Sequence, residues 1–357
     1  MTIVTALVPL IAGLSVTALA IPGIITLAHR KRWYDERNHR KIHVADTPRI
    51  GGVGIFGGFV AAIALSLALV APRGDYLTPV WAGTFGELWP LGIGILLVHA
   101  LGLYDDFRGL RAALKLMIQI AAAVIVTLGP YRIESITIPF VWIDIGLGPF
   151  SHVITVVWIV AITNALNFID GVDGLAAGTA AIAALAFAAI AVIVGQSLVA
   201  LVALGLVGAL VGFLLYNSPP ARIFMGDSGA YVLGFALAVL PLMTRDASGR
   251  TMSLLPALTV LALPALDMTT AVFRRLRRGK HPFSADREHI HHKLMDLGLQ
   301  SWSLLMVAHG STIVMGAVAV AWYLLPQNTV VASVLVAWAV AAILTGVITR
   351  RQHLGKP

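Results

Sequence analysis

The residues best suited to chemistry are aspartates that stand beside glycines in three separate segments. They are Asp105 and Asp106 after Gly-Leu-Tyr, Asp170 and Asp173 in Asp-Gly-Val-Asp-Gly, and Asp227 in Phe-Met-Gly-Asp-Ser-Gly. Clustered carboxylates cannot all stay ionised without a cation, and Mg²⁺ takes oxygen ligands from one or two carboxylates and substrate phosphates. With Lys and Arg nearby, the pattern indicates a magnesium and phosphate site, provided that the fold brings the segments together.

Two of these segments could also have a purely structural role. Asp105 and Asp106 could form a solvated turn after a helix. Asn164, Asn167 and Asp170 recur every three residues along one side of a helix, where they could serve as polar contacts between helices or point into a site. The residues alone leave both interpretations open.

A histidine group and a glycine string add two further motifs. His289, His291 and His292 stand beside Lys293 and could bind zinc, contact phosphate or lie in a solvated loop; the neighbouring basic residues favour phosphate. The Gly-Val-Gly-Ile-Phe-Gly string at 52–57 has the spacing of a dinucleotide-binding loop, but no strand precedes it. We therefore interpret its glycines as sites of close helix packing.

The elements that must position these residues are predicted to be membrane helices. Of the 357 residues, 58% are hydrophobic and 12% are charged, against about 25% charged in ordinary globular domains, and the mean hydropathy is +0.88. Eleven apolar segments approach the ~20 residues that a helix needs to cross ~30 Å of hydrocarbon. They cover residues 5–28, 50–71, 89–104, 112–129, 152–168, 175–194, 197–216, 229–244, 252–273, 303–325 and 329–349. We expect an all-α polytopic membrane protein with about eleven transmembrane helices, which excludes a soluble enzyme, a disordered tail and a fibrous protein.

The basic residues predict the orientation of this bundle. Twenty of the 25 Lys and Arg residues fall in connections on one side, with seven each in 29–49 and 274–302, and four fall on the other side. By the positive-inside rule the basic side is cytoplasmic. We expect one integral membrane domain over 1–357, its amino terminus outside, its carboxyl terminus inside, and 29–49 and 274–302 as large cytoplasmic loops. The acidic segments then share the cytoplasmic rim.

Composition also limits the partners and the chemistry. The net charge of +8 follows mostly from topology, and the lack of a basic stripe with interleaved aromatic residues excludes a nucleic-acid partner. The absence of cysteine excludes a disulfide framework, a thiolate nucleophile and a cysteine-ligated metal.

Five strings in series resemble the polyprenyl-phosphate N-acetylhexosamine-1-phosphate transferase superfamily, of the glycosyltransferase family 4 type. They are Pro48-Arg-Ile-Gly-Gly; Asp105-Asp106 with Lys115; Asn164-Ala-Leu-Asn-Phe-Ile-Asp-Gly-Val-Asp-Gly; Asn217 followed by Ala221-Arg-Ile-Phe-Met-Gly-Asp-Ser-Gly; and Asp286-Arg-Glu-His-Ile-His-His. The resemblance runs from about residue 35 to 297 and is greatest to the bacterial members that use undecaprenyl phosphate and GlcNAc. The phospho-MurNAc-pentapeptide transferases carry Thr-Pro-Thr-Met-Gly-Gly and three consecutive histidines, whereas this chain has Thr-Pro-Arg-Ile-Gly-Gly and His-Ile-His-His. That substrate is therefore the alternative.

The resemblance implies transfer of a sugar-1-phosphate from a UDP-N-acetylhexosamine to polyprenyl phosphate, with release of UMP. It implies Mg²⁺ as cofactor, with Mn²⁺ as a substitute, membrane lipids as surroundings, and the bacterial inner membrane as location. The product would begin a cell-envelope polysaccharide such as lipopolysaccharide or teichoic acid. The resemblance leaves a homodimer open.

The matching motifs also imply roles for individual residues. Asp227 is expected to bind the metal with Asn167 beside it, Asp105 and Asp106 to act in the transfer step, and Lys115 to contact phosphate. The other expected substrate-binding residues are Asn164, Asp170, Asp173, Asn217, Arg222, His289, His291 and His292, with Arg40, Lys41 and His43 at the lipid phosphate.

Two questions stay open at the level of sequence. The lipid phosphate could attack the UDP-sugar directly, which we favour, or an aspartate could form a covalent phospho-sugar intermediate. A secondary transporter or lipid flippase would also use many helices and buried aspartates, but it would place them near the bilayer midplane in two repeats. Here the aspartates are expected to lie along one rim, and the sequence shows no internal repeat.

Overall fold

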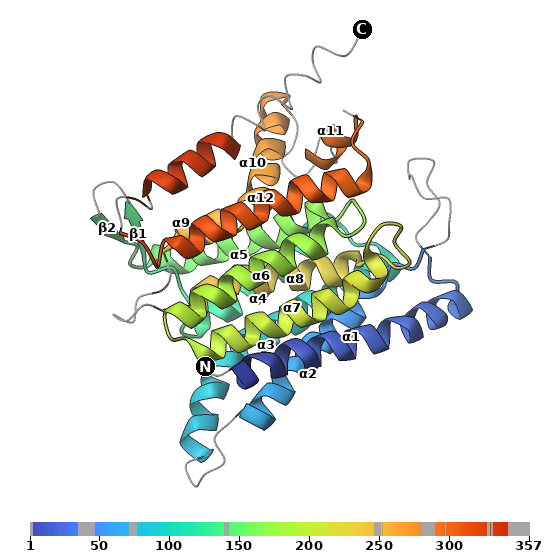
Figure 1. The fold of residues 1–357 in the computed structure, drawn as a ribbon, viewed down its shortest axis with the longest axis horizontal. Coiled ribbons are helices and arrows are strands. Elements are labelled where there is room, and N and C mark those ends of the chain that lie inside the picture. The colour runs from blue at the N-terminus through green and yellow to red at the C-terminus, as the bar shows by residue number, and fades with distance from the viewer. Residues whose placement is uncertain are drawn as a thin grey trace.

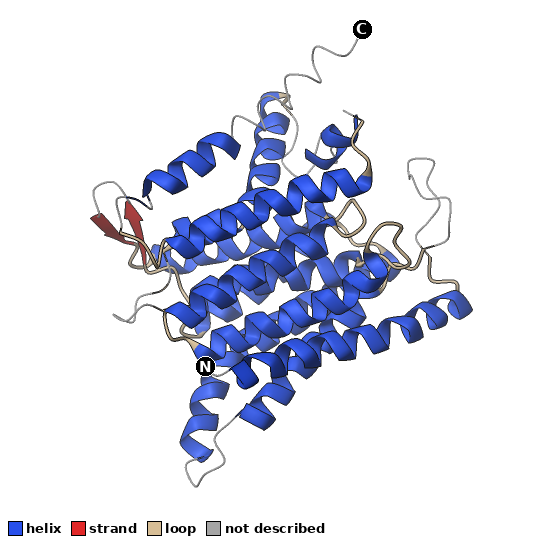
Figure 2. Ribbon diagram, in the orientation of Figure 1, coloured by secondary structure: helices blue, strands red, loops and turns tan. Residues whose placement is uncertain are grey.

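The protein is a bundle of long helices that lie side by side (Figures 1 and 2). The computed structural model describes residues 3–34, 47–70, 77–138, 143–245, 251, 253–279, 290–296, 298–326, 329 and 331–341. The elements are α1 (Ile3–Lys31), α2 (Gly51–Val70), α3 (Leu77–Arg108), α4 (Ala112–Leu128), β1 (Ser135–Ile138), β2 (Ile143–Gly146), α5 (Phe150–Ile169), α6 (Leu175–Ile193), α7 (Ser197–Asn217), α8 (Gly226–Met243), α9 (Leu254–Val260), α10 (Ala262–Arg277), α11 (Ile290–Asp296) and α12 (Ser301–Ala321).

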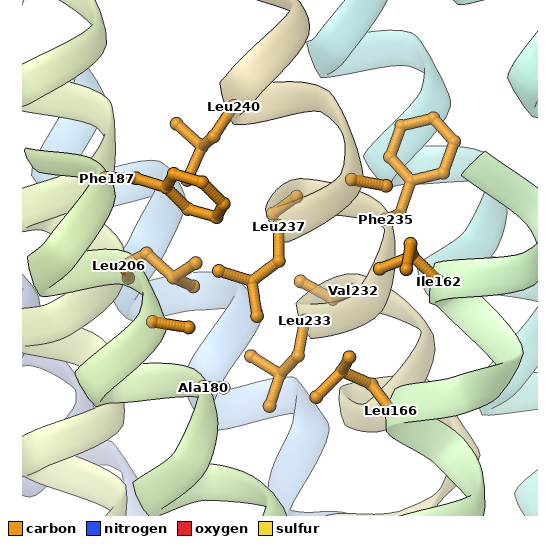
Figure 3. Close-up of a cluster of buried hydrophobic side chains, with 14 of the residues drawn as sticks. Ile162, Leu166, Ala180, Phe187, Leu206, Val232, Leu233, Phe235, Leu237 and Leu240 are labelled. Atoms are coloured by element: carbon orange, nitrogen blue, oxygen red, sulfur yellow. The ribbon is translucent and has the colours of Figure 1, made fainter. Parts of the chain in front are cut away.

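Helix α8 forms the centre of the bundle. Every residue of α8 is buried, and α2, α3, α5 and α6 all pack against it. Figure 3 shows Leu233 and Leu237 of α8 between Phe187 and Leu206 on one side and Ile162 on the other. Because α8 is enclosed along its whole length, a polar group at its amino-terminal end is held inside protein and not in lipid.

Eight helices in the described part of the chain are long and apolar enough to cross a membrane, or nine if the bent pair α9 and α10 is one span. This confirms an all-α polytopic membrane protein but not the count of eleven. The segment 112–129 forms α4, which at 17 residues is shorter than the other spans. The last segment, 329–349, is described only at 329 and over 331–341, and Val331–Ala341 is also a short apolar helix.

The segment 252–273, expected as one helix, is broken. Helices α9 and α10 meet at Leu261 with a bend of 89°. Pro264 lies in the first turn of α10. Because proline has no backbone N–H and its ring clashes with the carbonyl one turn earlier, a continuous helix across Val260 and Pro264 is disfavoured.

A two-stranded hairpin between α4 and α5 was not expected either. Strands β1 and β2 pair in antiparallel fashion, with Ile136 opposite Ile145 and Ile138 opposite Ile143. The four isoleucines share one face because side chains alternate along a strand. This alternation is visible in Ser-Ile-Thr-Ile, so the strand signal was present but short.

Glycines let α1 and α7 pack with their backbones in contact. A Cβ atom added to Gly208 would lie 2.1 Å from the carbonyl oxygen of Leu10, and one added to Gly212 would lie 2.6 Å from that of Leu14. Lipid is as apolar as a leucine side chain, so membrane helices associate through such close packing and not through the hydrophobic effect.

Gly208→Val is therefore expected to force α1 away from α7 and to lower the free energy of unfolding by about 2 kcal/mol. Gly57→Val is the matched control, because a Cβ atom at Gly57 would meet nothing within 4 Å. Thermal unfolding of the purified variants measures the difference. Equal stability of the two variants would contradict the packing.

Candidate active site

Three helix ends meet at one end of the bundle. Helix α3 ends two residues after Asp106, α5 ends two residues after Asn167, and α8 begins one residue before Asp227. Helices α3 and α5 both pack against α8. The structure thus brings together the aspartate segments that are far apart in the sequence, at the opposite end of α5 from the hairpin.

Asp227 is the centre of the cluster. Its Oδ1 accepts hydrogen bonds from Arg49 Nη2 at 3.1 Å and Asn167 Nδ2 at 3.2 Å. Its Oδ2 accepts from Lys115 Nζ at 3.1 Å and from the Tyr231 hydroxyl at 3.0 Å. Each carboxylate oxygen of this buried aspartate therefore accepts hydrogen bonds from one cationic and one neutral donor.

Asp106 caps the first turn of α8. Its Oδ1 accepts from the backbone N–H of Asp227 at 2.8 Å, and its Oδ2 accepts from that of Ser228 at 3.1 Å. These N–H groups have no partner within the helix, and a negative charge at the amino-terminal end of a helix is favourable. Asp106 thus fixes the backbone that carries Asp227.

The tight turn before Asp227 requires glycine. Gly226 has φ +72°, and a Cβ atom there would lie 2.4 Å from the carbonyl oxygen of Arg49 and 2.6 Å from Asp106 Oδ2. Neither the backbone angle nor the space admits a side chain.

Asp105 and Asp227 share one ammonium group. Lys115 Nζ forms ion pairs with Asp105 Oδ2 and with Asp227 Oδ2. Asp105 Oδ1 also accepts the backbone N–H of Leu110 at 2.5 Å. Although Asp105 and Asp106 are adjacent in the sequence, they have different partners: Asp105 faces the basic group and Asp106 faces the backbone of α8.

The segment before α2 joins the cluster through backbone pairing. The N–H of Phe224 donates to the carbonyl of Pro48 at 2.8 Å, and the N–H of Gly51 donates to the carbonyl of Phe224 at 2.9 Å. A Cβ atom on Gly52 would lie 2.2 Å from Gly229 N. This pairing brings the side chain of Arg49 over Asp227.

Asn164 has a different setting from Asn167. Its Nδ2 donates to Gln119 Oε1 at 2.7 Å and to the carbonyl of Val160 at 2.8 Å. Asn164 thus links α5 to α4, one turn from the carboxylates, whereas Asn167 points into the cluster. Both interpretations of the asparagine series therefore apply, each to a different residue.

Asp173 and Asn217 hold two loops together. Asp173 Oδ2 accepts the N–H of Ala221 at 2.9 Å. Asn217 Oδ1 accepts the N–H of Gly174 at 3.0 Å, and its Nδ2 donates to the carbonyl of Ile223 at 2.8 Å. These bonds fasten the loop after α5 to the segment that leads into α8.

Asp170 is half-buried beside the cluster, just after α5. Burial raises the pKa of Asp170 well above its usual range, the charge of Arg49 lowers it, and the charges of Asp227, Asp106 and Asp173 raise it. An ionised Asp170 therefore requires added positive charge nearby.

Several predicted residues lie apart from the cluster or cannot be placed. Arg222 is exposed, with its guanidinium 4.8 Å from the centre of the Tyr216 ring and Nη2 3.2 Å from the carbonyl of Leu215. His291 and His292 lie in α11, but their side chains are not among those described. Four further predicted residues lie outside the described residues: Arg40, Lys41, His43 and His289.

Three residues that contribute to the site were not expected from the sequence. Arg49 was counted only as a basic residue, although it stands in the Pro-Arg-Ile-Gly-Gly string. Tyr231 and Gln119 lie four residues after Asp227 and Lys115 respectively, which places each pair on one helix face. This spacing was the signal that could have identified them.

The residues of the cluster fit a magnesium ion shared with a substrate. Among the described residues, no three carboxylate or histidine side chains converge as a ready-made metal site. Mg²⁺ is usually held by one or two carboxylates plus phosphate oxygens and does not need such a cage. Asp227, which shares the ammonium group of Lys115 with Asp105, supplies the carboxylate that this mode requires.

The fold and the cluster define a multi-pass membrane protein with a carboxylate site at its helix ends. The model of glycosyl transferase family 4 matches residues 88–245, the part of the chain that carries Asp105, Asp106, Lys115, Asn167 and Asp227. The chain belongs to this family, as its similarity to the Bacillus subtilis relative described next shows, and the resemblance is confirmed.

Curated relatives align over most of the chain. A probable undecaprenyl-phosphate N-acetylglucosaminyl 1-phosphate transferase of Bacillus subtilis (strain 168) is 31% identical over 303 residues, which are 85% of this chain and 80% of the relative. The undecaprenyl-phosphate alpha-N-acetylglucosaminyl 1-phosphate transferase of Salmonella typhi is 28% identical over 84% of this chain and 79% of its own. That of Escherichia coli (strain K12) is 28% identical over 75% and 70%.

Proposed function

We propose that this protein transfers GlcNAc-1-phosphate from UDP-GlcNAc to undecaprenyl phosphate and releases UMP. The observation that carries the proposal is the cluster of Asp105, Asp227 and Lys115 at one end of the helical bundle, where a lipid phosphate and a soluble nucleotide can meet. The names of the relatives support the same donor sugar and acceptor.

The reaction joins two anions. An oxygen of the lipid phosphate forms a bond to the β-phosphorus of the donor, and the bond from that phosphorus to the bridging oxygen breaks, so the leaving group is UMP. Such a transfer depends on neutralising charge and aligning the groups. Lys115 is placed to bind a phosphate oxygen. Bound Mg²⁺, with Asp227 as ligand and Mn²⁺ as a substitute, supplies charge neutralisation at the diphosphate.

The contacts support direct displacement over a covalent intermediate. A phosphate monoester has its second pKa near ~6, so the acceptor is mostly a dianion at neutral pH and needs little help from a base. Asp106 uses both oxygens to hold α8, which leaves it poorly placed as a nucleophile. Asp105, paired with Lys115, is the residue that we expect to orient the acceptor.

An apolar groove beside the cluster suits the prenyl chain. It lies between α4, α5 and α10, has a volume of about 360 Å³, and reaches Asn164 and Phe168, the neighbours of Asn167 along α5. A lipid tail in this groove would place its phosphate near the start of α4 and the end of α5.

We propose that the site faces the cytoplasm of a bacterial inner membrane, with the amino terminus outside and the carboxyl terminus inside. The basic asymmetry of the connections supports this orientation. A reporter enzyme fused after Lys280 is expected to be active only in the cytoplasm. Reporter activity only in the periplasm would contradict the proposed orientation.

The proposed function is tested with purified protein, Mg²⁺, undecaprenyl phosphate and a panel of UDP-sugars, with UMP release as the readout. We expect UMP with UDP-GlcNAc, and none when the acceptor or Mg²⁺ is omitted. Release only with UDP-MurNAc-pentapeptide would favour the alternative substrate. No release with any amino sugar would refute the transferase and return attention to a transporter.

A further inference from the structure

The half-exposed guanidinium group of Arg49 covers the cluster. Its Nη2 lies 3.1 Å from Asp227 Oδ1 and its Nε lies 3.7 Å from Asp106 Oδ1. The Arg49 side chain is 42% exposed, whereas those of Asp106 and Asp227 are 1% and 10% exposed. Arg49 is thus the part of the ion-pair cluster that solvent reaches most easily.

Asp227 has no acceptor position left for a metal ion. An ionised carboxylate offers about four lone-pair directions, and Asp227 accepts four hydrogen bonds, from Arg49, Asn167, Lys115 and Tyr231. If Asp227 binds Mg²⁺, as the proposed function requires, at least one of these donors must leave.

Arg49 is the donor that can leave at the lowest cost. Asn167 and Tyr231 are fixed on the helices α5 and α8. Lys115 is held by Asp105 in a closer ion pair than that of Arg49 with Asp106, and its side chain is less exposed, at 24%. Arg49 alone stands on a connecting segment before α2, where its long side chain can turn toward solvent while the paired backbone stays in place.

We propose that Arg49 competes with the metal for Asp227 and moves to the donor diphosphate when the metal binds. This exchange rests on the proposed function, since it assigns Arg49 as a further substrate-binding residue of the same site. A guanidinium group binds phosphate oxygens through two parallel hydrogen bonds. The positive charge that pairs with Asp227 is then used again on the substrate.

The exchange predicts effects of opposite sign on metal and nucleotide. In Arg49→Gln, the competing charge is gone, so the Mg²⁺ concentration for half-maximal thermal stabilisation, measured without nucleotide, is expected to fall on the order of tenfold. In the same variant at saturating Mg²⁺, the dissociation constant of UDP-GlcNAc is expected to rise about tenfold or more. If Arg49 only supported the fold, Arg49→Gln would weaken the binding of both Mg²⁺ and UDP-GlcNAc.

Two further variants control for charge and folding. Arg49→Lys keeps the charge but loses the planar fork, so its Mg²⁺ midpoint is expected to stay within about twofold of the wild type while UDP-GlcNAc binding weakens. Arg108→Gln removes one positive charge from an exposed position at the end of α3 and is expected to change neither value.

The outcomes separate this inference from the proposed function. An unchanged or raised Mg²⁺ midpoint in Arg49→Gln would overturn the exchange. If that variant does not fold, wild-type affinity of Arg49→Lys for UDP-GlcNAc would overturn it instead. Failure of the wild type to release UMP would remove the proposed function, whereas the Mg²⁺ midpoints, measured without nucleotide, still test whether Arg49 competes with the metal.

Discussion

Asp227→Asn is expected to lower Mg²⁺-dependent UMP release by about a thousandfold. The amide carries no charge and offers a single oxygen, so it cannot hold a divalent cation and also accept from Asn167 and Lys115. The guanidinium group of Arg49 would lose its ion pair with Asp227 as well. The measurement is a Mg²⁺ titration of UMP release at saturating substrates, in which residual activity should need far more Mg²⁺.

Tyr231→Phe is the matched control for this prediction. It removes one hydrogen bond to Asp227 Oδ2 but keeps the carboxylate, so activity is expected to stay within about tenfold of the wild type. If the Asp227→Asn variant bound UDP-GlcNAc with an unchanged Mg²⁺ requirement, Asp227 would not be the metal ligand.

Asp105→Asn and Asp106→Asn are expected to differ, although the two residues are adjacent. Asp105→Asn should lower turnover by about a hundredfold or more and keep Mg²⁺-dependent UDP-GlcNAc binding, because Asp105 is expected to act on the acceptor. Asp106→Asn should also lower turnover, and in addition lower the free energy of unfolding by about 2 kcal/mol, because its amide group faces the backbone N–H groups of Asp227 and Ser228.

Calorimetric titration of UDP-GlcNAc and thermal unfolding distinguish these two outcomes. If Asp105→Asn lost the Mg²⁺ dependence of nucleotide binding while Asp227→Asn kept it, the roles of the two aspartates would be exchanged. If the Asp106→Asn variant were as stable as the wild type, the capping of α8 by Asp106 would contribute little to the free energy of unfolding.

The membrane helices could be predicted because the signal is long. The apolar segments at 152–168, 175–194 and 197–216 correspond closely to α5, α6 and α7, since nearly twenty apolar residues in a row have few other uses. The break at Leu261 and the hairpin depend on short signals, a proline in the first turn and four alternating residues. The mean hydropathy of a window of about twenty residues detects neither the helix break nor the hairpin.

The site could be predicted by residue type but not by arrangement. Asp227 and Asp105 were identified because carboxylates near a bilayer are kept for function. The division of work between Asp105 and Asp106 depends on the direction in which each side chain leaves α3, which adjacent positions in a sequence do not reveal. Arg49 lies 178 residues from Asp227 in the chain, and the backbone pairing of Pro48 and Gly51 with Phe224 brings them together.

The proposed transfer of phosphate is tested by following the β-phosphate of the donor. Purified protein is incubated with Mg²⁺, undecaprenyl phosphate and UDP-GlcNAc labelled with radioactive phosphorus in the β-position, and the lipid and water phases are separated. Transfer of GlcNAc-1-phosphate predicts that the label enters the lipid phase together with the sugar, while unlabelled UMP appears in water. If the sugar entered the lipid phase and the label remained in UDP, the enzyme would break the bond at the sugar carbon, and phosphate transfer at this site would be wrong.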